Sequence, residues 1–287
     1  MTTTRPVNRV YASRPTIEGA GVHLRRAFGF DETGLFDPFL MLDDFRSNDP
    51  AGFMAGFPWH PHRGIETVTY VLTGEVAHGD SMGNRGVIGP GCVQWMTAGG
   101  GIVHQEMPAG DEDGRLEGFQ LWVNLPASQK MREARYRGVT SDEIPAVTTA
   151  DGSVVRVIAG QVDGVKGPVG DIIVEPEYLD VTVPCRARFV HRTTPGHTVF
   201  AYVIAGRGRF EPEGEGAGNH TVILFGDGDA VEVTAGDEGV RFLLVSGKPL
   251  GEPIAWRGPI VMNTQEELRD AFRQYADGTF LGHKKAS

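Results

Sequence analysis

Two short motifs place candidate metal ligands at alternating positions of the chain. His60 and His62 stand two residues apart, and His104 and Glu106 repeat that spacing later in the sequence. Because successive side chains of a β-strand point to opposite faces, residues two apart share a face and can reach one ion. The spacing therefore predicts two neighbouring strands that bring three imidazoles and one carboxylate into a common cavity.

Three nitrogens and one oxygen form a ligand set that suits a divalent first-row metal and leaves one or two coordination positions free. An open position indicates a reactive site rather than a structural one. A single His-x-His pair in a β-rich chain is as consistent with a solvated surface as with a metal. Two such pairs, each beside glycine turns, favour the metal site.

Glu66 is a fifth candidate on the strand that follows the first motif. It is in phase with Val68, Tyr70 and Leu72, which we expect to form the inward face of that strand, while Thr69 and its neighbouring threonines take the other face. An inward Glu66 would be a further ligand or a proton acceptor beside the ion.

Composition favours an all-β protein with two domains. The 287 residues exceed the usual size of one domain, and 40 glycines and 18 prolines separate short apolar runs. Such punctuation is typical of many short strands joined by turns. Long amphipathic helices are nearly absent from the sequence.

Charge and cysteine content exclude several classes of function. The net charge of -10, without a cluster of lysines and arginines, disfavours direct binding to nucleic acid or to anionic membranes. No stretch reaches the ~20 apolar residues that a membrane helix needs. Cys92 and Cys185 form no Cys-x-x-Cys motif, which fits a reducing compartment, so we expect a cytoplasmic protein.

An internal repeat relates the two halves of the chain. GIETVTYVLTG at 64–74 matches GHTVFAYVIAG at 196–206 in length, in both terminal glycines and in a Tyr-Val pair. GPGCVQWMTAG at 89–99 matches GDGDAVEVTAG at 226–236 at the leading glycines and the closing Thr-Ala-Gly. Two copies of one β unit predict an N-terminal barrel at 1–140 and a C-terminal barrel at 141–287 that ends in a helix.

The second copy lacks the ligand types of the first. The residues that these matches set opposite His60, His62, His104 and Glu106 are Arg192, Thr194, Arg241 and Leu243. Alternatively, VRFLLVSG at 240–247 matches the strand FQLWVNL, which leaves the His-x-Glu strand without a counterpart. Either alignment predicts a metal site in the N-terminal barrel and none in the C-terminal one.

Other segments supply scaffold. Residues 1–30 alternate polar and apolar types, which predicts edge strands of the first barrel. DPFLMLDDF at 37–45 predicts a buried strand closed by two aspartates, which either line the entrance of the cavity or, as is more common, form a plain turn. His78 and Asp80 lie beside a glycine-rich turn, where we expect them to be exposed. Thr264 and Glu267 form a capping box that opens a helix with an apolar face.

At these residues the sequence resembles the pirin family of bicupins, through PHRGIETVTYVLTG, QWMTAGGGIVHQEMP, GFQLWVNLP and GPIVMNTQEEL. The resemblance covers most of the chain. It implies two antiparallel β-barrels of the jelly-roll type, one metal ion, usually iron, in the N-terminal barrel, and none in the other. It also implies that His60, His62, His104 and Glu106 are the ligands and that Glu66 is not coordinated.

The family resemblance implies two kinds of activity. The first is the 2,3-dioxygenation of a flavonol such as quercetin at an open Fe(II) site, with dioxygen as co-substrate; other first-row metals would fit the same ligands. The second is a non-enzymatic regulatory role, in which bound iron tunes a surface for a protein partner. A sugar-binding or isomerase cupin is a third class, for which we find no sugar-contacting side chains.

The dioxygenase hypothesis needs a base that accepts the proton of the flavonol 3-hydroxyl. Glu106 and Glu66 are both candidates for that catalytic role. Trp95 and Met96 are candidates for an aromatic-lined pocket, although barrel core is the more common role for such residues. Arg63 stands beside the ligands, either supporting them or in solvent.

Overall fold

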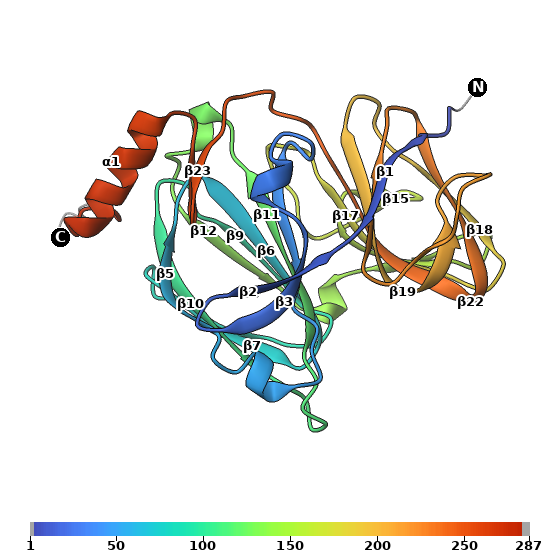
Figure 1. Cartoon of the computed structure of the whole chain (residues 1–287), viewed down its shortest axis with the longest axis horizontal. Helices are drawn as coiled ribbons and strands as arrows, with labels where there is room; N and C mark the ends of the chain where they lie inside the picture. The colour runs from blue at the N-terminus through green and yellow to red at the C-terminus, as the bar shows by residue number, and fades with distance from the viewer. Residues whose placement is uncertain (1–2, 283–287) are drawn as a thin grey trace. The chain divides into compact units, whose positions relative to one another are not determined.

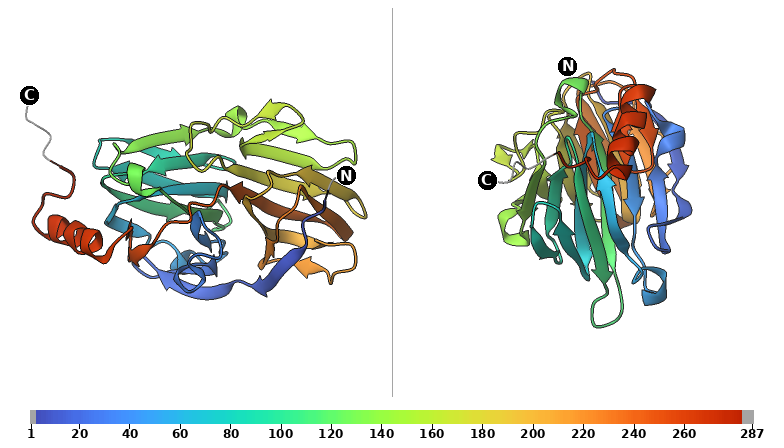
Figure 2. Two further views of the ribbon diagram at one scale, coloured as in Figure 1. Left: turned by 90° about the horizontal axis from the view of Figure 1, so that it is seen from above. Right: turned by 90° about the vertical axis from the view of Figure 1, so that its left-hand side faces the viewer.

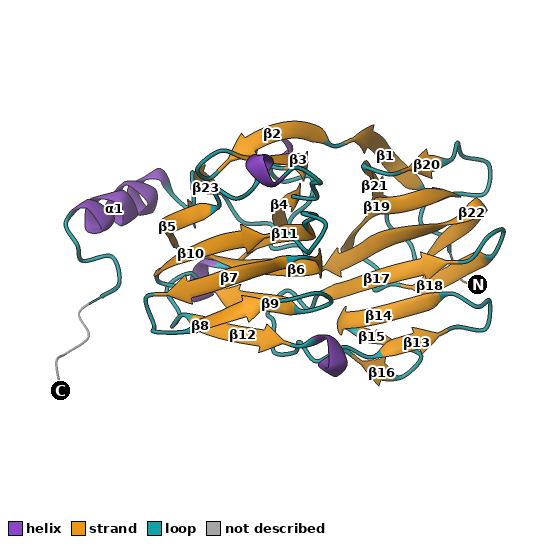
Figure 3. Ribbon diagram, turned by 90° about the horizontal axis from the view of Figure 1, so that it is seen from below, coloured by secondary structure: helices purple, strands orange, loops and turns teal. Residues whose placement is uncertain are grey.

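A computed structural model describes residues 3–282 of the chain, whose regular secondary structure is mostly strand (Figure 3). Contacts between Cα atoms divide it into two compact units, each discontinuous in sequence. Of the described residues, we call 15–33, 39–141 and 250–282 the first barrel, and 3–14, 34–38 and 142–249 the second barrel. The all-β prediction of two antiparallel barrels with a short C-terminal helix is confirmed, whereas a domain boundary at residue 140 stays a prediction.

The first barrel is made of two antiparallel sheets (Figure 1). Its larger sheet has the order β12-β9-β6-β11-β4-β3-β2, with β12 Arg135–Val139, β9 Val93–Thr97, β6 Ile65–Thr73, β11 Glu117–Asn124, β4 Phe39–Asp44, β3 Val22–Phe28 and β2 Arg14–Glu18. Its smaller sheet has the order β5-β10-β7-β8, with β5 Phe57–His62, β10 Ile102–Ala109, β7 Glu75–Asp80 and β8 Arg85–Ile88. Short 3-10 turns at η1 Phe30–Glu32, η2 Pro50–Gly52, η3 Ala127–Gln129 and η4 Ser141–Glu143 connect strands.

The second barrel is one nine-stranded sheet. Its order is β1-β21-β19-β22-β17-β14-β13, with β18 paired to β22 and β20 paired to β19. The strands are β1 Val7–Ala12, β21 Thr221–Phe225, β19 Thr198–Arg209, β22 Ala230–Gly247, β17 Glu177–Val183, β14 Val154–Ala159, β13 Ala146–Thr148, β18 Arg188–Arg192 and β20 Ala217–Gly218. The hairpin β15 Gln161–Val162 and β16 Val165–Lys166 forms a separate ladder.

Strand pairing supports the first repeat match and decides between the two alignments of the second. In the first barrel β6 lies between β9 and β11, and in the second barrel β19 lies between β21 and the end of β22. The segment VRFLLVSG is therefore the counterpart of β11. The start of β22 pairs with β18 as β10 pairs with β5, so matching GDGDAVEVTAG to the strand β9 was wrong. Short glycine-flanked motifs recur at several turns of one barrel, and this causes the misalignment.

Two further expectations differ from the structure. Strand β1 pairs with β21 of the second barrel and not with the first barrel, because alternation marks a strand without naming its partner. His78 and Asp80 are buried rather than exposed, since the turn beside them begins only after Asp80. Figure 2 shows the N-terminal strands and the C-terminal helix from two further directions.

The C-terminal segment belongs to the first barrel. The hairpin of β23 Ala255–Arg257 and β24 Ile260–Met262 leads to α1 Gln265–Ala276, whose N-terminus carries the predicted capping box of Thr264 and Glu267. On α1, Leu268 and Ala271 are buried and contact the hairpin. Within residues 3–282, no helix has both the length and the apolar character that crossing a membrane requires.

Candidate metal centre

Three histidine rings converge inside the first barrel. His60 and His104 face each other across the β5–β10 ladder, and His62 shares the face of His60. Ring centroids lie 4.3 Å apart for His60 and His104, 4.8 Å for His60 and His62, and 4.9 Å for His62 and His104. One nitrogen from each ring lies within 4.8 Å of the other two, so the predicted alternation brings these three side chains together.

Backbone carbonyls fix the orientation of two of the rings. The Nδ1 of His60 lies 2.8 Å from the Pro58 carbonyl, and the Nδ1 of His62 lies 3.1 Å from the carbonyl of Pro259. A carbonyl can only accept, so both Nδ1 atoms carry the proton and, in the neutral rings, both Nε2 atoms present lone pairs. This is the outer support that metal-binding histidines use in proteins.

The ring nitrogens fit a cation. The two Nε2 atoms of His60 and His62 are 3.1 Å apart, and two lone pairs at that distance repel unless a positive charge lies between them. Both nitrogens of the buried His104 lack a hydrogen-bond partner in the part of the chain that is described. A buried nitrogen without a partner costs free energy, and coordination of one ion would give one His104 nitrogen a partner and would remove the repulsion between the other two rings.

Burial also keeps the imidazoles neutral. Desolvation lowers the pKa of His60, and it lowers the pKa values of His62 and His104 well below the usual range, with the neighbouring imidazoles adding to the effect. A neutral imidazole is the form that ligates a metal.

Glu106 lies on the same face of β10 as His104 and lines a cavity together with His60 and His62, but it is not one of the three clustered groups. The register of β10 against β5 shifts between His104 and Glu106, and Oε1 of Glu106 accepts a hydrogen bond of 2.8 Å from Thr69. Burial raises the pKa of Glu106 to about 7, with the Thr69 hydroxyl acting in the opposite direction. Its role as a fourth ligand stays a prediction.

Glu66 differs from the expectation. Strand β6 pairs without a bulge from Glu66 to Tyr70, so Glu66 and the cavity-lining Thr69 are on opposite faces. The carboxylate of Glu66 accepts hydrogen bonds from Trp95 at 3.0 Å and from Thr97 at 2.6 Å. Both faces of β6 are buried, so apolar periodicity could not identify the face that lines the cavity, and the face predicted for Glu66 was wrong.

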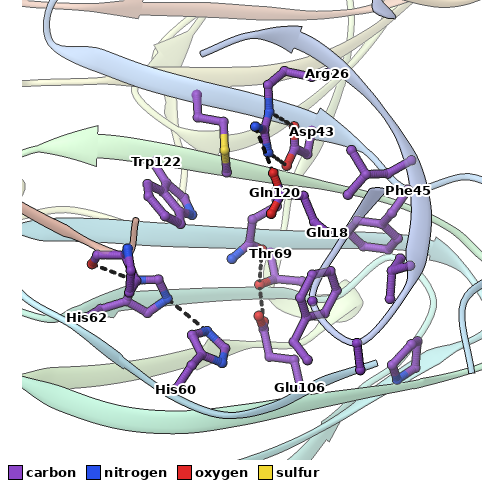
Figure 4. A pocket seen from close by; sticks show the side chains of 18 of the residues that line it. Glu18, Arg26, Asp43, Phe45, His60, His62, Thr69, Glu106, Gln120 and Trp122 are labelled. Atoms are coloured by element: carbon purple, nitrogen blue, oxygen red, sulfur yellow. Dashed lines mark hydrogen bonds and ion pairs between the residues drawn. The ribbon is translucent and has the colours of Figure 1, made fainter. Parts of the chain in front are cut away.

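A cavity of about 630 Å³ opens beside His60 and His62 and lies wholly within the first barrel. That volume is in the range of roughly 300–1,000 Å³ that small-molecule sites occupy. Figure 4 shows His60 and His62 at one end, Arg26 and Asp43 at the other, and Thr69 and Gln120 between them. The lining also includes apolar side chains, among them Leu24, Met41, Phe45, Phe57, Trp122 and Trp256.

Sequence reasoning missed several of these lining groups. The tryptophans that line the cavity are Trp122 and Trp256, whereas Trp95 and Met96 do not line it. The ring centroid of Trp122 lies 5.0 Å from that of His62. Alternation along GFQLWVNLP could have placed Trp122 on the inner face once its pairing with β6 was known. Asp43 also lines the cavity, which was the less favoured of the two alternatives for the aspartates that close its strand.

Arg63 follows His62 in sequence and binds the C-terminal segment. Its guanidinium is buried and donates to the carbonyl of Gly100 at 2.7 Å, to Gln274 at 2.9 Å and to the carbonyl of Phe280 at 2.7 Å. It also lies 4.1 Å from the ring centroid of Phe280. Arg63 therefore fastens the C-terminal segment to the strand that carries His62.

Comparisons with known proteins agree with this geometry. The profile of the Pirin family matches residues 21–123, and that of the pirin C-terminal cupin domain matches residues 178–281. A protein of Pseudomonas aeruginosa, provisionally named a quercetin 2,3-dioxygenase, is 45% identical over 97% of this chain and 99% of its own length. A pirin-like protein of Caulobacter vibrioides is 44% identical over 96% of this chain and 99% of its own length.

A solved structure extends the likeness to three dimensions. The crystal structure of a quercetin 2,3-dioxygenase from Acinetobacter baumannii has a TM-score of 0.88 at 33% sequence identity. The match covers 96% of this chain and 98% of that one.

Proposed function

Because the chain belongs to the pirin family, we propose that it is a metal-dependent dioxygenase that acts on a flavonol such as quercetin at a mononuclear iron site. The observation that carries this proposal is the histidine cluster at one end of a cavity with apolar walls. The provisional name of the Pseudomonas aeruginosa relative and the name of the Acinetobacter baumannii structure support the same reaction.

The histidines are the ligands in this proposal. His60, His62 and His104 hold the ion through one nitrogen each, and Glu106 is within the same cavity to serve as a fourth ligand or as a base. When bound, Fe(II) supplies a Lewis acid for the flavonol oxygen and redox chemistry toward dioxygen. The carbonyls of Pro58 and Pro259 hold the two rings in place during the reaction.

Glu106 is the residue that we propose takes the proton of the flavonol 3-hydroxyl. Its carboxylate is buried and lines the cavity, and Thr69 contacts both Oε1 of Glu106 and Oε1 of Gln120, at 2.8 and 2.6 Å. A hydroxyl has one proton, so at any moment Thr69 donates a hydrogen bond either to the ionised Glu106 or to Gln120. Once Oε1 of Glu106 is protonated, it can donate a hydrogen bond to the Thr69 hydroxyl, which then donates its own proton to Oε1 of Gln120. This arrangement holds the new proton on Oε1 of Glu106.

The cavity walls supply the remaining requirements. Trp122, Met41 and Phe45 offer an apolar surface to a flat aromatic ligand and exclude water from the reacting centre. We place the reaction in the cytoplasm, where a reducing environment fits the free thiols of Cys92 and Cys185.

The direct test is turnover by protein loaded with iron under anaerobic conditions, then mixed with quercetin and oxygen. Loss of the flavonol absorbance band should be faster than with the same concentration of free iron. His62→Ala should abolish turnover, whereas His191→Ala in the second barrel should leave it unchanged.

Turnover no faster than with free iron would contradict the dioxygenase proposal. The protein would then be better described by the second function, that of an iron-binding regulatory protein that acts through a protein partner. Retention of iron by the same preparation would separate that result from a failure to load the metal.

A further inference from the structure

A row of polar side chains crosses the floor of the cavity. Arg26 of β3 lies directly opposite Asp43 of β4, Asp43 opposite Gln120 of β11, and Gln120 opposite Thr69 of β6. Directly opposed residues share one face of a sheet, so these four side chains form a line across four strands. Thr69 ends the line with its hydrogen bond to Glu106, beside the histidines.

Apolar residues flank this row. Met41 and Trp122 are directly opposite each other on one side of it, and Phe45 packs over Gly118 on the other. At Gly118 a Cβ would lie 2.4 Å from the Phe45 ring, so only glycine leaves room for the ring at this position. The cavity thus combines apolar walls with polar groups at both ends, an arrangement that suits a long, flat ligand with polar atoms at each end.

The charges at the end remote from the histidines are arranged to accept hydrogen bonds. Arg26 donates from Nε and Nη2 to the two oxygens of Asp43, both at 2.8 Å, and its Nη1 lies 2.9 Å from Glu18. Two carboxylates therefore occupy one guanidinium. A carboxylate has about four acceptor sites, and Arg26 fills only one on each oxygen of Asp43.

Stability alone is a weak reason to keep this pair in a cavity wall. Burying an ion pair costs desolvation energy that its attraction often fails to recover. Burial raises the pKa of Asp43 to about 6, against the opposing effect of Arg26, so the carboxylate remains ionised at neutral pH. A ligand hydroxyl that donates to Asp43 would replace part of the lost hydration.

We propose that Asp43, with Glu18 beside it, determines substrate specificity by accepting hydrogen bonds from hydroxyl groups on the part of the substrate that lies farthest from the histidines. This inference rests on the proposed dioxygenase function. It names the preferred substrates as flat aromatic compounds that carry phenolic hydroxyls at both ends. Substrates with a carboxylate or sulfate at the remote end are disfavoured, because the two carboxylates that already pair with Arg26 there would repel them.

The test compares two flavonols that differ only at the remote ring: quercetin, whose ring carries two adjacent hydroxyls, and galangin, whose ring carries none. Binding to the iron-loaded protein is measured without oxygen by quenching of tryptophan fluorescence, since Trp122 and Trp256 line the cavity. A hydrogen bond to a charged acceptor predicts that quercetin binds about 10- to 100-fold more tightly than galangin.

Matched variants separate recognition from folding. Asp43→Asn should reduce the preference to about threefold or less. Asp44→Asn is the control, because Asp44 is also buried and also accepts from an arginine, namely from Nε of Arg46 at 2.8 Å and Nη2 at 2.6 Å, but it points to the opposite face of β4. The control should retain the full preference. Glu18→Gln, at a more exposed position, should reduce the preference by a smaller factor even if Asp43→Asn fails to fold.

The outcomes distinguish the two proposals. If wild-type protein binds and turns over both flavonols equally well, the dioxygenase function stands and the role of Asp43 is wrong. A preference that survives both Asp43→Asn and Glu18→Gln overturns it as well. If wild-type protein neither binds nor turns over any flavonol, the proposed function fails, and this inference fails with it.

Discussion

The two barrels share a strand arrangement and differ in what fills it. In the first, the cross-strand pairs at the centre are His60 with His104 and His62 with Ile102. In the second, the buried pairs in the same order along β18 and β22 are Phe189 with Val233 and His191 with Val231.

Only one imidazole therefore persists at these positions of the second barrel. His191 contacts the carboxylate of Glu177 at 3.2 Å and lies parallel to the ring of Phe189. The interior of that barrel is packed with aliphatic and aromatic side chains, such as Leu179, Phe210 and Phe242.

The difference shows that the fold alone does not make the site. The paired strands carry a candidate metal centre in the first barrel and packed core residues in the second, although the order of the pairs along them is comparable. The first barrel also receives a C-terminal segment, which supplies the Pro259 carbonyl to His62.

The largest effect is expected from removing one imidazole in each barrel. His104→Ala should lower bound metal from about one ion per chain to nearly none, because two remaining imidazoles do not complete a site. His191→Ala should leave about one ion per chain. Elemental analysis of the purified variants measures both. Metal retained by His104→Ala, or lost by His191→Ala, would show that the sites are assigned to the wrong barrel.

A second test uses the glycines that open the two copies of the repeat. Gly64 and Gly196 have φ angles of +79° and +78°, but a Cβ at Gly64 would lie 1.9 Å from the Val261 carbonyl oxygen, while a Cβ at Gly196 meets nothing within 4 Å. Gly196→Ala should cost about 1 kcal/mol from the left-handed backbone alone. Gly64→Ala should cost about 3 to 4 kcal/mol, because the clash with the C-terminal hairpin is added.

Urea unfolding measures this difference with two probes. All four tryptophans lie in the first barrel, so tryptophan fluorescence reports the unfolding of that barrel in Gly64→Ala. Circular dichroism reports the unfolding of the second barrel in Gly196→Ala. Equal losses of stability would mean that the hairpin of β23 and β24 is not tightly packed against the strand that carries His62.

A smaller effect is expected from Lys130, a buried lysine of the first barrel that donates to the Gly64 carbonyl at 2.9 Å and to Asn124 at 2.7 Å. Burial lowers its pKa from 10.5 to about 8. Below pH 8 the lysine is charged in both states and the fold bears the full cost of burying that charge. Between pH 8 and 10.5 only the unfolded chain keeps the proton, so stability should rise with pH.

Lys130→Met removes this titration. Relative to the variant, wild-type protein should gain up to about 3 kcal/mol in unfolding free energy between pH 7 and pH 10.5. Denaturant titrations at the two pH values, followed by tryptophan fluorescence, measure the gain. A difference between the proteins that does not change with pH would place the Lys130 ammonium in contact with water.

Much of this picture could be predicted from the sequence because alternation and glycine spacing are local. The His-x-His strand, the facing strand with His104, the two-barrel architecture and the capping box of α1 all follow from short-range patterns. The convergence of three imidazoles follows from the period of a strand together with one correct pairing.

The remaining features depend on contacts between residues far apart in sequence. Both faces of β6 are buried, so periodicity could not tell that Glu66 points away from the cavity. Asp43 lines the cavity because β4 pairs with β3 and β11, and no local pattern specifies those partners. The support that Pro259 gives to His62 joins residues 197 positions apart.

The most direct test of the metal centre is an anomalous difference map at the iron absorption edge, from crystals of the iron-loaded protein. We predict one peak per chain, within bonding distance of a nitrogen of each of His60, His62 and His104. A peak beside His191, or an ion bound without these three rings, would contradict the assignment of the site to the first barrel.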